Sequence, residues 1–293
     1  EGTGVGAGEL IAASFLFSRS PANPSMPMHP KRLGRNKGGY FGETITVESA
    51  LVCCLRAARK HGWRTDILPV APGLELVALR REGRKGAKRL FVSAGMHGDE
   101  PAGPLAVWRL LKQNRWPEDI DLWVCPCLNP TGFQRNQREN HNEVDLNRQY
   151  HLPADAEPEV LAHVEWLKRQ PGFDAAICLH EDWESNGFYL YPLGADVSDS
   201  TVGSVLASVE SVCPIDRGDM IDGMPARDGI MQVPENPQES MSDWPEAFYL
   251  LEEKTSACFT FEAPSDFPLL LRVSALVRAV MTVAEDLSGD SAQ

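Results

Sequence analysis

Four apolar runs of the chain each end in a polar side chain that can do chemistry, and this feature constrains the fold most. The runs are "LFVSAGMH", "WVCPCLN", "AAICLH" and "CFTFE", and they end at His97, Asn129, His180 and Glu262. Short apolar runs separated by helical patterns are typical of buried strands in a parallel sheet. Such sheets bind ligands beyond the carboxyl ends of their strands. The sequence therefore predicts that these four residues share one site.

Helical patterns separate these runs and predict an α/β fold. One helix is expected to begin at Val47, with Thr46 as its N-cap, and others are expected over residues 103–113, 157–170 and 269–287. Alternating strands and helices predict a largely parallel sheet with helices on both faces. The runs "LELVALR" and "LFVSA", which the charged turn "REGRKGAKR" joins, predict a β-hairpin.

The charge of the chain limits its partners. The net charge is −13 over 293 residues. A protein this acidic is repelled by phosphate backbones and by anionic membrane surfaces. No apolar run approaches the roughly 18 residues of a membrane helix. We therefore expect neither a nucleic acid nor a membrane partner, which leaves a small molecule or a peptide.

The cysteines and the first residues bear on location and domain boundaries. The seven cysteines lie mostly in apolar runs and include no CxxC pair, so we expect buried thiols. Together with the lack of a convincing signal peptide, this usage favours a reducing, cytoplasmic location. Residues 1–30, rich in Gly, Ser and Pro, are expected to be a leader, an expression remnant or a disordered arm. The folded domain is then 31–293.

A histidine and an acid three positions apart follow the first of these runs. His97 and Glu100 belong to "HGDE", where a tight turn brings their side chains together. An HxxE spacing also occurs by chance in proteins of this length. With His180, however, the pair makes two histidines and one glutamate, a known ligand set of catalytic zinc sites. The other histidines are expected to be solvated; they are His29, His61, His141, His151 and His163.

Glu262 and an arginine-rich loop supply the remaining groups that a zinc hydrolase needs. The attacking water needs a base for its proton, and the leaving group needs an acid. Glu262 directly follows an apolar strand, where burial would raise its pKa to a useful range for both. The loop over 129–150 carries groups that can bind a carboxylate or a developing oxyanion. These are Arg135, Arg138, Asn147 and Arg148.

The order of the motifs resembles that of the zinc carboxypeptidase family, the funnelins. "HGDE", "NPTG", "REN", "VDLNR", a strand-end histidine and a late strand-end glutamate follow one another over about residues 90–264. The short stretch between Arg148 and His180 resembles the compact bacterial branch related to murein peptide amidases. The resemblance implies a single α/β/α domain around a mixed, mostly parallel central sheet.

The resemblance also implies a metal site and its chemistry. It implies one zinc ion per chain, held by His97, Glu100 and His180. It implies that Glu262 acts as general base and general acid. The family's mobile active-site tyrosine has no clear counterpart, although Tyr249 lies in about the right region of the sequence.

The same resemblance assigns roles to four further residues. Asn147 and Arg148 would hold the terminal carboxylate of the substrate. Arg138 would polarise the scissile carbonyl and stabilise the oxyanion. Asp145 would accept the free ring N–H of His97, which strengthens the histidine as a ligand.

Three functions are compatible with these motifs. The first is a metallocarboxypeptidase that acts on a peptide or small amide with a free carboxylate. The second is a deacylase of N-acylamino acids, since aspartoacylase and succinylglutamate desuccinylase share the ligand pattern. Those deacylases carry a β-rich domain after the catalytic glutamate, whereas one helix and a tail follow Glu262 here, which favours the peptidase. The third, an inactive peptide-binding protein, is disfavoured because every ligand and the glutamate are present.

Overall fold

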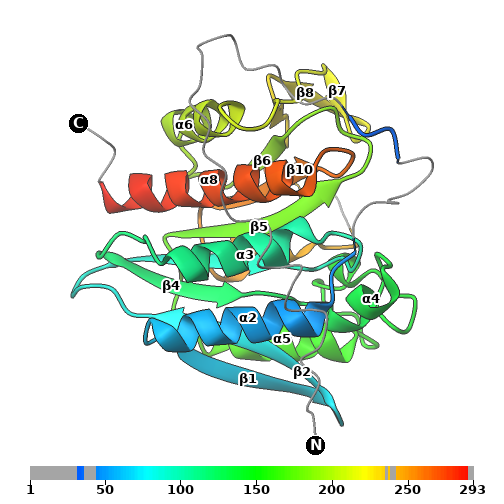
Figure 1. Cartoon of the computed structure of the whole chain (residues 1–293), viewed down its shortest axis with the longest axis vertical. Coiled ribbons are helices and arrows are strands. Elements are labelled where there is room, and N and C mark those ends of the chain that lie inside the picture. Colours follow the sequence, from blue (N-terminus) through cyan, green and yellow to red (C-terminus); the bar gives the residue numbers. More distant parts are fainter. Residues whose placement is uncertain (1–31, 36–43, 235–236, 238–241, 290–293) are drawn as a thin grey trace, which may run out of the picture.

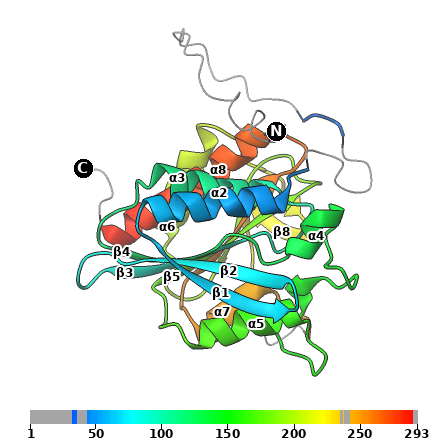
Figure 2. The ribbon, with the colours of Figure 1, turned by 60° about the horizontal axis from the view of Figure 1, so that its bottom comes forward.

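A ten-stranded mixed sheet forms the centre of the molecule, and helices cover both of its faces (Figures 1 and 2). The computed structural model describes residues 32–35, 44–234, 237 and 242–289. The strand order is β1-β2-β4-β3-β5-β10-β6-β9-β8-β7. This architecture confirms the predicted α/β fold class.

Parallel strands occupy the middle of the sheet. They are, in spatial order, β4 (Ile120–Cys125), β3 (Lys88–Ala94), β5 (Ala175–Asp182) and β10 (Cys258–Pro264). Most of their side chains are buried, as expected for strands that are covered on both faces. Their carboxyl ends lie together, and we call this the carboxyl end of the sheet.

The strands on both sides of this centre run mostly antiparallel to their neighbours. On one side lie β2 (Leu74–Arg81) and the edge strand β1 (Arg64–Ala71). On the other side, β6 (Tyr189–Leu193) runs antiparallel to β10. Three short strands complete the sheet beyond it: β9 (Ile230–Met231), β8 (Met224–Arg227) and β7 (Met220–Ile221).

The predicted hairpin between residues 74–80 and 90–94 is wrong, because β4 lies between β2 and β3. β2 pairs instead with β1 through a turn in which Gly73 has a φ of 80°. β1 has no clear strand signal in the sequence, because it is an edge strand with mostly exposed or half-buried side chains and a proline. Such a strand lacks the apolar run that marks a buried one.

The helices divide between the two faces of the sheet (Figure 2). One face is covered by α2 (Val47–Lys60), α3 (Ala102–Gln113), α6 (Asp199–Glu210) and α8 (Leu269–Ser288). The other is covered by α5 (Pro158–Lys168) and α7 (Glu246–Glu253). The four predicted helices are confirmed, whereas α6 and α7 lie in a region for which the sequence predicted no elements. The loop after β4 holds the short helix α4 (Pro130–Arg135) and the 3-10 turn η1 (Leu146–Arg148).

One histidine of α5 corrects an expectation. His163 was predicted to be solvated, but it is fully buried, and its Nδ1 lies 2.8 Å from Oη of Tyr150. It sits among Val160, Val164 and Leu167 on the face of α5 that packs against the sheet. Burial lowers the pKa of His163 to about 3, so this imidazole is a neutral core residue.

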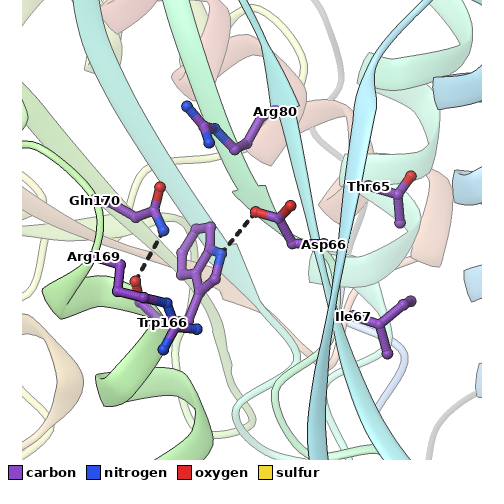
Figure 3. A pocket seen from close by; sticks show the side chains of 7 residues that line it. All are labelled: Thr65, Asp66, Ile67, Arg80, Trp166, Arg169 and Gln170. Carbon is purple, nitrogen blue, oxygen red and sulfur yellow. Dashed lines mark hydrogen bonds between the residues drawn. The ribbon is translucent and has the colours of Figure 1, made fainter.

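A polar pocket of about 500 Å³ lies between α5 and the edge strands, away from the carboxyl end of the sheet. In it, Nε1 of Trp166 donates a hydrogen bond to Asp66 of β1 at 3.0 Å (Figure 3). This bond ties the end of α5 to the edge strand. None of the residues predicted for the functional site lines this pocket.

Three further expectations concern the whole chain. All seven cysteines are free and six are buried, which confirms the predicted buried thiols. In the ranges that the structure describes, no helix combines the length and the apolar character needed to cross a membrane. The arm predicted over residues 1–30 lies outside the described residues.

Candidate active site

Three of the predicted residues converge at the carboxyl end of the sheet. His97 and Glu100 lie in the turn between β3 and α3, and His180 lies near the end of β5. One nitrogen or oxygen atom of each lies within 4.8 Å of the others, and all three residues are buried. Nδ1 of His97 is 2.6 Å from Oε1 of Glu100, and Nδ1 of His180 is 3.0 Å from Oε2. We call these residues the His-Glu-His group.

Glycine and asparagine residues shape the turn that holds this group. A Cβ at Gly98 would lie 2.1 Å from the backbone carbon of Gly132, so the "HGDE" and "NPTG" segments meet only because Gly98 has no side chain. Asn129 caps α4 by accepting the N–H of Gly132, and its amide group donates to the carbonyls of Met96 and Arg138. Asn129 therefore lies close to the group, as predicted, but it is engaged with the backbone.

The charges of the group support one another. Burial lowers the pKa of His97, but the carboxylates of Glu100 and Asp145 outweigh this effect and raise the pKa to about 9. Burial raises the pKa of Glu100, yet the two histidines outweigh it and hold the pKa well below its usual range. Two imidazoles and one ionised carboxylate form a donor set that fits a divalent cation such as zinc.

Asp145 links His97 to Arg138. Oδ1 of Asp145 is 3.2 Å from Nε2 of His97, and its Oδ2 accepts Nε of Arg138 at 3.0 Å. A proton on Nε2 that is donated to Asp145 leaves Nδ1 of His97 free to act as a metal ligand. Nη1 of Arg138 lies 3.3 Å from Nδ1 of His97 and 3.9 Å from Oε1 of Glu100. Arg138 is thus at the group, whereas Arg135 is exposed and donates to the carbonyl of His141.

Glu262 lies beside the group on the neighbouring strand. It pairs in register with His180, so the two side chains leave the same face of the sheet. Burial raises the pKa of Glu262 well above its usual range, and the nearby His180 opposes this shift. Phe259 and Phe261 of the same strand pack into the core on the opposite face.

Two tyrosine-aspartate pairs lie near Glu262, and they were not predicted from the sequence. Tyr189 pairs in register with Glu262 and donates to Asp182, and Tyr191 donates to Asp222, each at 3.1 Å. Asp182 and Asp222 both contribute to the raised pKa of Glu262. One sequence signal was available: Asp222 precedes a glycine in the turn between β7 and β8, and an Asp-Gly pair is typical of tight hairpins.

The two residues predicted to bind a substrate carboxylate follow Asp145 in η1. Oδ1 of Asn147 accepts the backbone N–H of Glu246 at 2.9 Å. Arg148 is exposed, and its Nη1 donates to the carbonyl of Asn147. Tyr249, by contrast, is buried in α7 with its ring centroid 6.1 Å from that of Tyr150, so it does not face the group.

The carboxyl end of the sheet thus collects these segments on one side of the molecule. The end of β5, α4 and the β7–β8 hairpin all lie there (Figure 1). Sequence motifs that are far apart in the chain meet at this place, as the strand-end residues predicted.

One family model and several known proteins are similar to this chain. The model of the Succinylglutamate desuccinylase/Aspartoacylase catalytic domain matches residues 86–200. Carboxypeptidase SOL1 of Arabidopsis thaliana is 35% identical over 120 residues, which are 34% of this chain and 24% of that protein. A candidate metallopeptidase from Shewanella baltica OS155 has a TM-score of 0.70 at 20% identity, over 82% of this chain and 92% of that one. A metallo-carboxypeptidase from Pseudomonas aeruginosa has a TM-score of 0.63 at 20% identity, over 84% and 70%.

The structure is an α/β fold with a candidate metal-binding group at the carboxyl end of its sheet. The matches above support the resemblance to the zinc carboxypeptidase family that the order of the motifs indicated. The solved structures carry the fold, and the family model covers His97, Glu100 and His180. The chain spans about a quarter of the length of the curated relatives that it matches.

Proposed function

We propose that the chain is a zinc-dependent hydrolase that cleaves a C-terminal peptide bond or a small amide next to a free carboxylate. The observation that carries this proposal is the convergence of His97, Glu100 and His180, with Glu262 on the adjacent strand. In this proposal, residues 31–293 form one catalytic domain and bind one zinc ion.

In this proposal, the residues around the zinc position have different roles in the reaction. Zinc supplies a Lewis acid that polarises a carbonyl and lowers the pKa of water. Glu262 takes a proton from the attacking water and passes it to the leaving amine. The positive charge of a bound cation lowers the raised pKa of Glu262 toward the range of a base. Arg138, which Asp145 holds in place, donates hydrogen bonds to the oxygen on which negative charge develops.

Asn147 and Arg148 bind the free carboxylate of the substrate in this proposal. Because Oδ1 of Asn147 already accepts the N–H of Glu246, its amide N–H groups remain as donors. Arg148 adds a guanidinium, which suits a carboxylate. The metallo-carboxypeptidase from Pseudomonas aeruginosa was solved in complex with (2-guanidinoethylmercapto)succinic acid. We expect this chain to bind carboxylate ligands as well.

Deacylation of N-acylamino acids is the second candidate function. The match to the desuccinylase and aspartoacylase catalytic domain favours it. It uses the same metal ligands and the same base, so the two functions differ in substrate alone. Parallel assays of the zinc-loaded protein with short peptides and with N-acylamino acids decide between them.

Amidation of a peptide's C-terminus is expected to lower kcat/KM by about 10- to 100-fold, because a charge-assisted hydrogen bond worth about 1.5–3 kcal/mol is lost. The rates are measured on matched free and amidated peptides. Asn147→Asp is the matched variant: it keeps the acceptor for the N–H of Glu246 but repels a carboxylate. It should slow hydrolysis of the free peptide far more than that of the amide. Equal rates on both peptides would contradict carboxylate recognition.

A further inference from the structure

Glu181 follows His180 in β5, and its side chain leaves the opposite face of the sheet. That side chain is fully buried. Its Oε1 accepts the backbone N–H of Ala102 at 2.5 Å, and its Oε2 pairs with Nη1 of Arg272. Glu181 therefore faces away from the proposed metal and is not placed to act as a base.

These contacts join the two segments that carry the ligands. Ala102 is the first residue of α3, so its N–H is one of those that a helix leaves without an internal partner. Ala102 lies two residues after Glu100, and Glu181 is the next residue in the chain after His180. One carboxylate therefore fixes the start of α3 relative to the end of β5.

Arg272 holds this carboxylate from the other side. It lies in the first turn of α8, and its side chain is fully buried. The N–H of Ser265, between β10 and α8, donates to the carbonyl of Asp182 at 2.8 Å, which further joins the end of β5 to α8. A buried ion pair is costly to desolvate and is weak evidence for stability by itself. Its position between the two ligand segments points to a different role.

We propose that Glu181 is a positioning residue that holds Glu100 and His180 at ligand distance before a metal binds, with Arg272 as its anchor. This inference rests on the proposed metal site. Asp145 contacts a ligand directly, whereas Glu181 acts through the backbone of α3 and of β5. Replacing residues behind metal ligands typically changes metal affinity by about 10- to 100-fold.

Two double variants test this role. One combines Glu181→Gln with Arg272→Met, and the other combines Glu181→Leu with Arg272→Met. Both remove the buried charges, and they differ in whether position 181 offers an oxygen to the N–H of Ala102. Zinc affinity is measured on metal-free protein by competition with a chromophoric chelator. We expect the double variant with Glu181→Leu to bind zinc about 10- to 100-fold more weakly than the one with Glu181→Gln.

A stability control and a measurement on the unaltered protein complete the test. Val280→Ala, about two turns further along α8, removes a fully buried side chain and should lower the melting temperature without changing zinc affinity. In the metal-free wild-type protein, the amide hydrogen of Ala102 should be protected from exchange. Exchange at the rate of an unstructured chain overturns the proposal, even if a double variant does not fold.

The outcomes separate the positioning role from the metal site itself. Absence of zinc binding by the wild-type protein overturns the proposed metal site. Zinc binding by the wild type, with equal affinities in the two double variants, overturns only the role of Glu181.

Discussion

Glu100 and Glu246 are two buried glutamates whose pKa values are shifted in opposite directions. Glu246 accepts a hydrogen bond from Ser93, and its Oε1 has no hydrogen-bond partner among the residues that the structure describes. Burial raises the pKa of Glu246 to about 7. Burial acts on Glu100 in the same way, but two histidines outweigh it and lower the pKa. Burial alone therefore favours a neutral carboxyl group in this fold. The histidines are what keep Glu100 charged and ready to hold a cation.

Glu262 and Asp145 extend this comparison. Glu262 resembles Glu246, since burial raises its pKa, but it stands next to His180 at the site. Asp145 resembles Glu100: burial raises its pKa, and His97 and Arg138 outweigh that effect and lower it. Among these four carboxyl groups, cationic neighbours outweigh burial at Glu100 and Asp145, and burial outweighs them at Glu246 and Glu262.

The largest expected effect comes from Glu262, the carboxyl group at the site whose pKa burial raises. Glu262→Gln keeps the shape and removes the base, so kcat should fall by about a hundredfold to ten-thousandfold while zinc is still bound. The acidic limb of the pH–rate profile should also disappear, because no carboxylate remains to be protonated there. Stopped assays of kcat against pH, with zinc content as the control, measure both. Turnover near the parent rate would show that the base lies elsewhere.

Glu246→Gln tests the raised pKa of the second buried glutamate. The unfolded carboxyl ionises near 4.5 and the folded one near 7, so between these values the folded protein keeps a proton that the unfolded chain has lost. The stability of the wild type therefore falls as pH rises through this window, by about 3 kcal/mol. The variant should lack this contribution. Denaturant unfolding of both proteins at pH 5 and pH 8 measures the difference, and an identical pH dependence would contradict the raised pKa.

Asp145→Asn tests a carboxyl group whose pKa is lowered by its cationic neighbours. It keeps the size of the side chain and removes the charge that holds the ring of His97. Zinc affinity should fall by about 10- to 100-fold. In the metal-free protein, the pKa of His97 should fall below its value of about 9, since one of the charges that raise it is lost. Chelator competition and an NMR titration of the imidazole test these two expectations, and an unchanged His97 titration would refute the link.

The sequence predicted the centre of the site because its signals are local. Each central strand is an apolar run, and the residue at its end is read directly, so His97, His180 and Glu262 could be placed at one end of the sheet. Side chains alternate between the two faces of a strand, so the side chain of Glu181 points to the face opposite that of His180. The pairing of the strands could not be predicted from the sequence. β4 lies between β2 and β3, and no local pattern encodes that order.

The remaining parts of the site come from segments with weak signals. Tyr189 and Tyr191 belong to a five-residue strand, and Asp222 belongs to a hairpin of very short strands. Their approach to Glu262 depends on pairing with β10, which is a tertiary contact. The burial of His163 likewise depends on the packing of α5 against the sheet. The sequence alone shows only a polar residue on a helix, which suggested a solvated side chain.

Zinc binding by the wild type and by His180→Ala tests the central claim most directly. Equilibrium dialysis followed by metal analysis gives the number of zinc ions per chain, and His141→Ala, which changes an exposed histidine, is the matched control. We predict one zinc per chain in the wild type and in His141→Ala, and none in His180→Ala, together with loss of hydrolysis. A His180→Ala protein that still binds one zinc per chain would contradict the assignment of His97, Glu100 and His180 as the metal ligands.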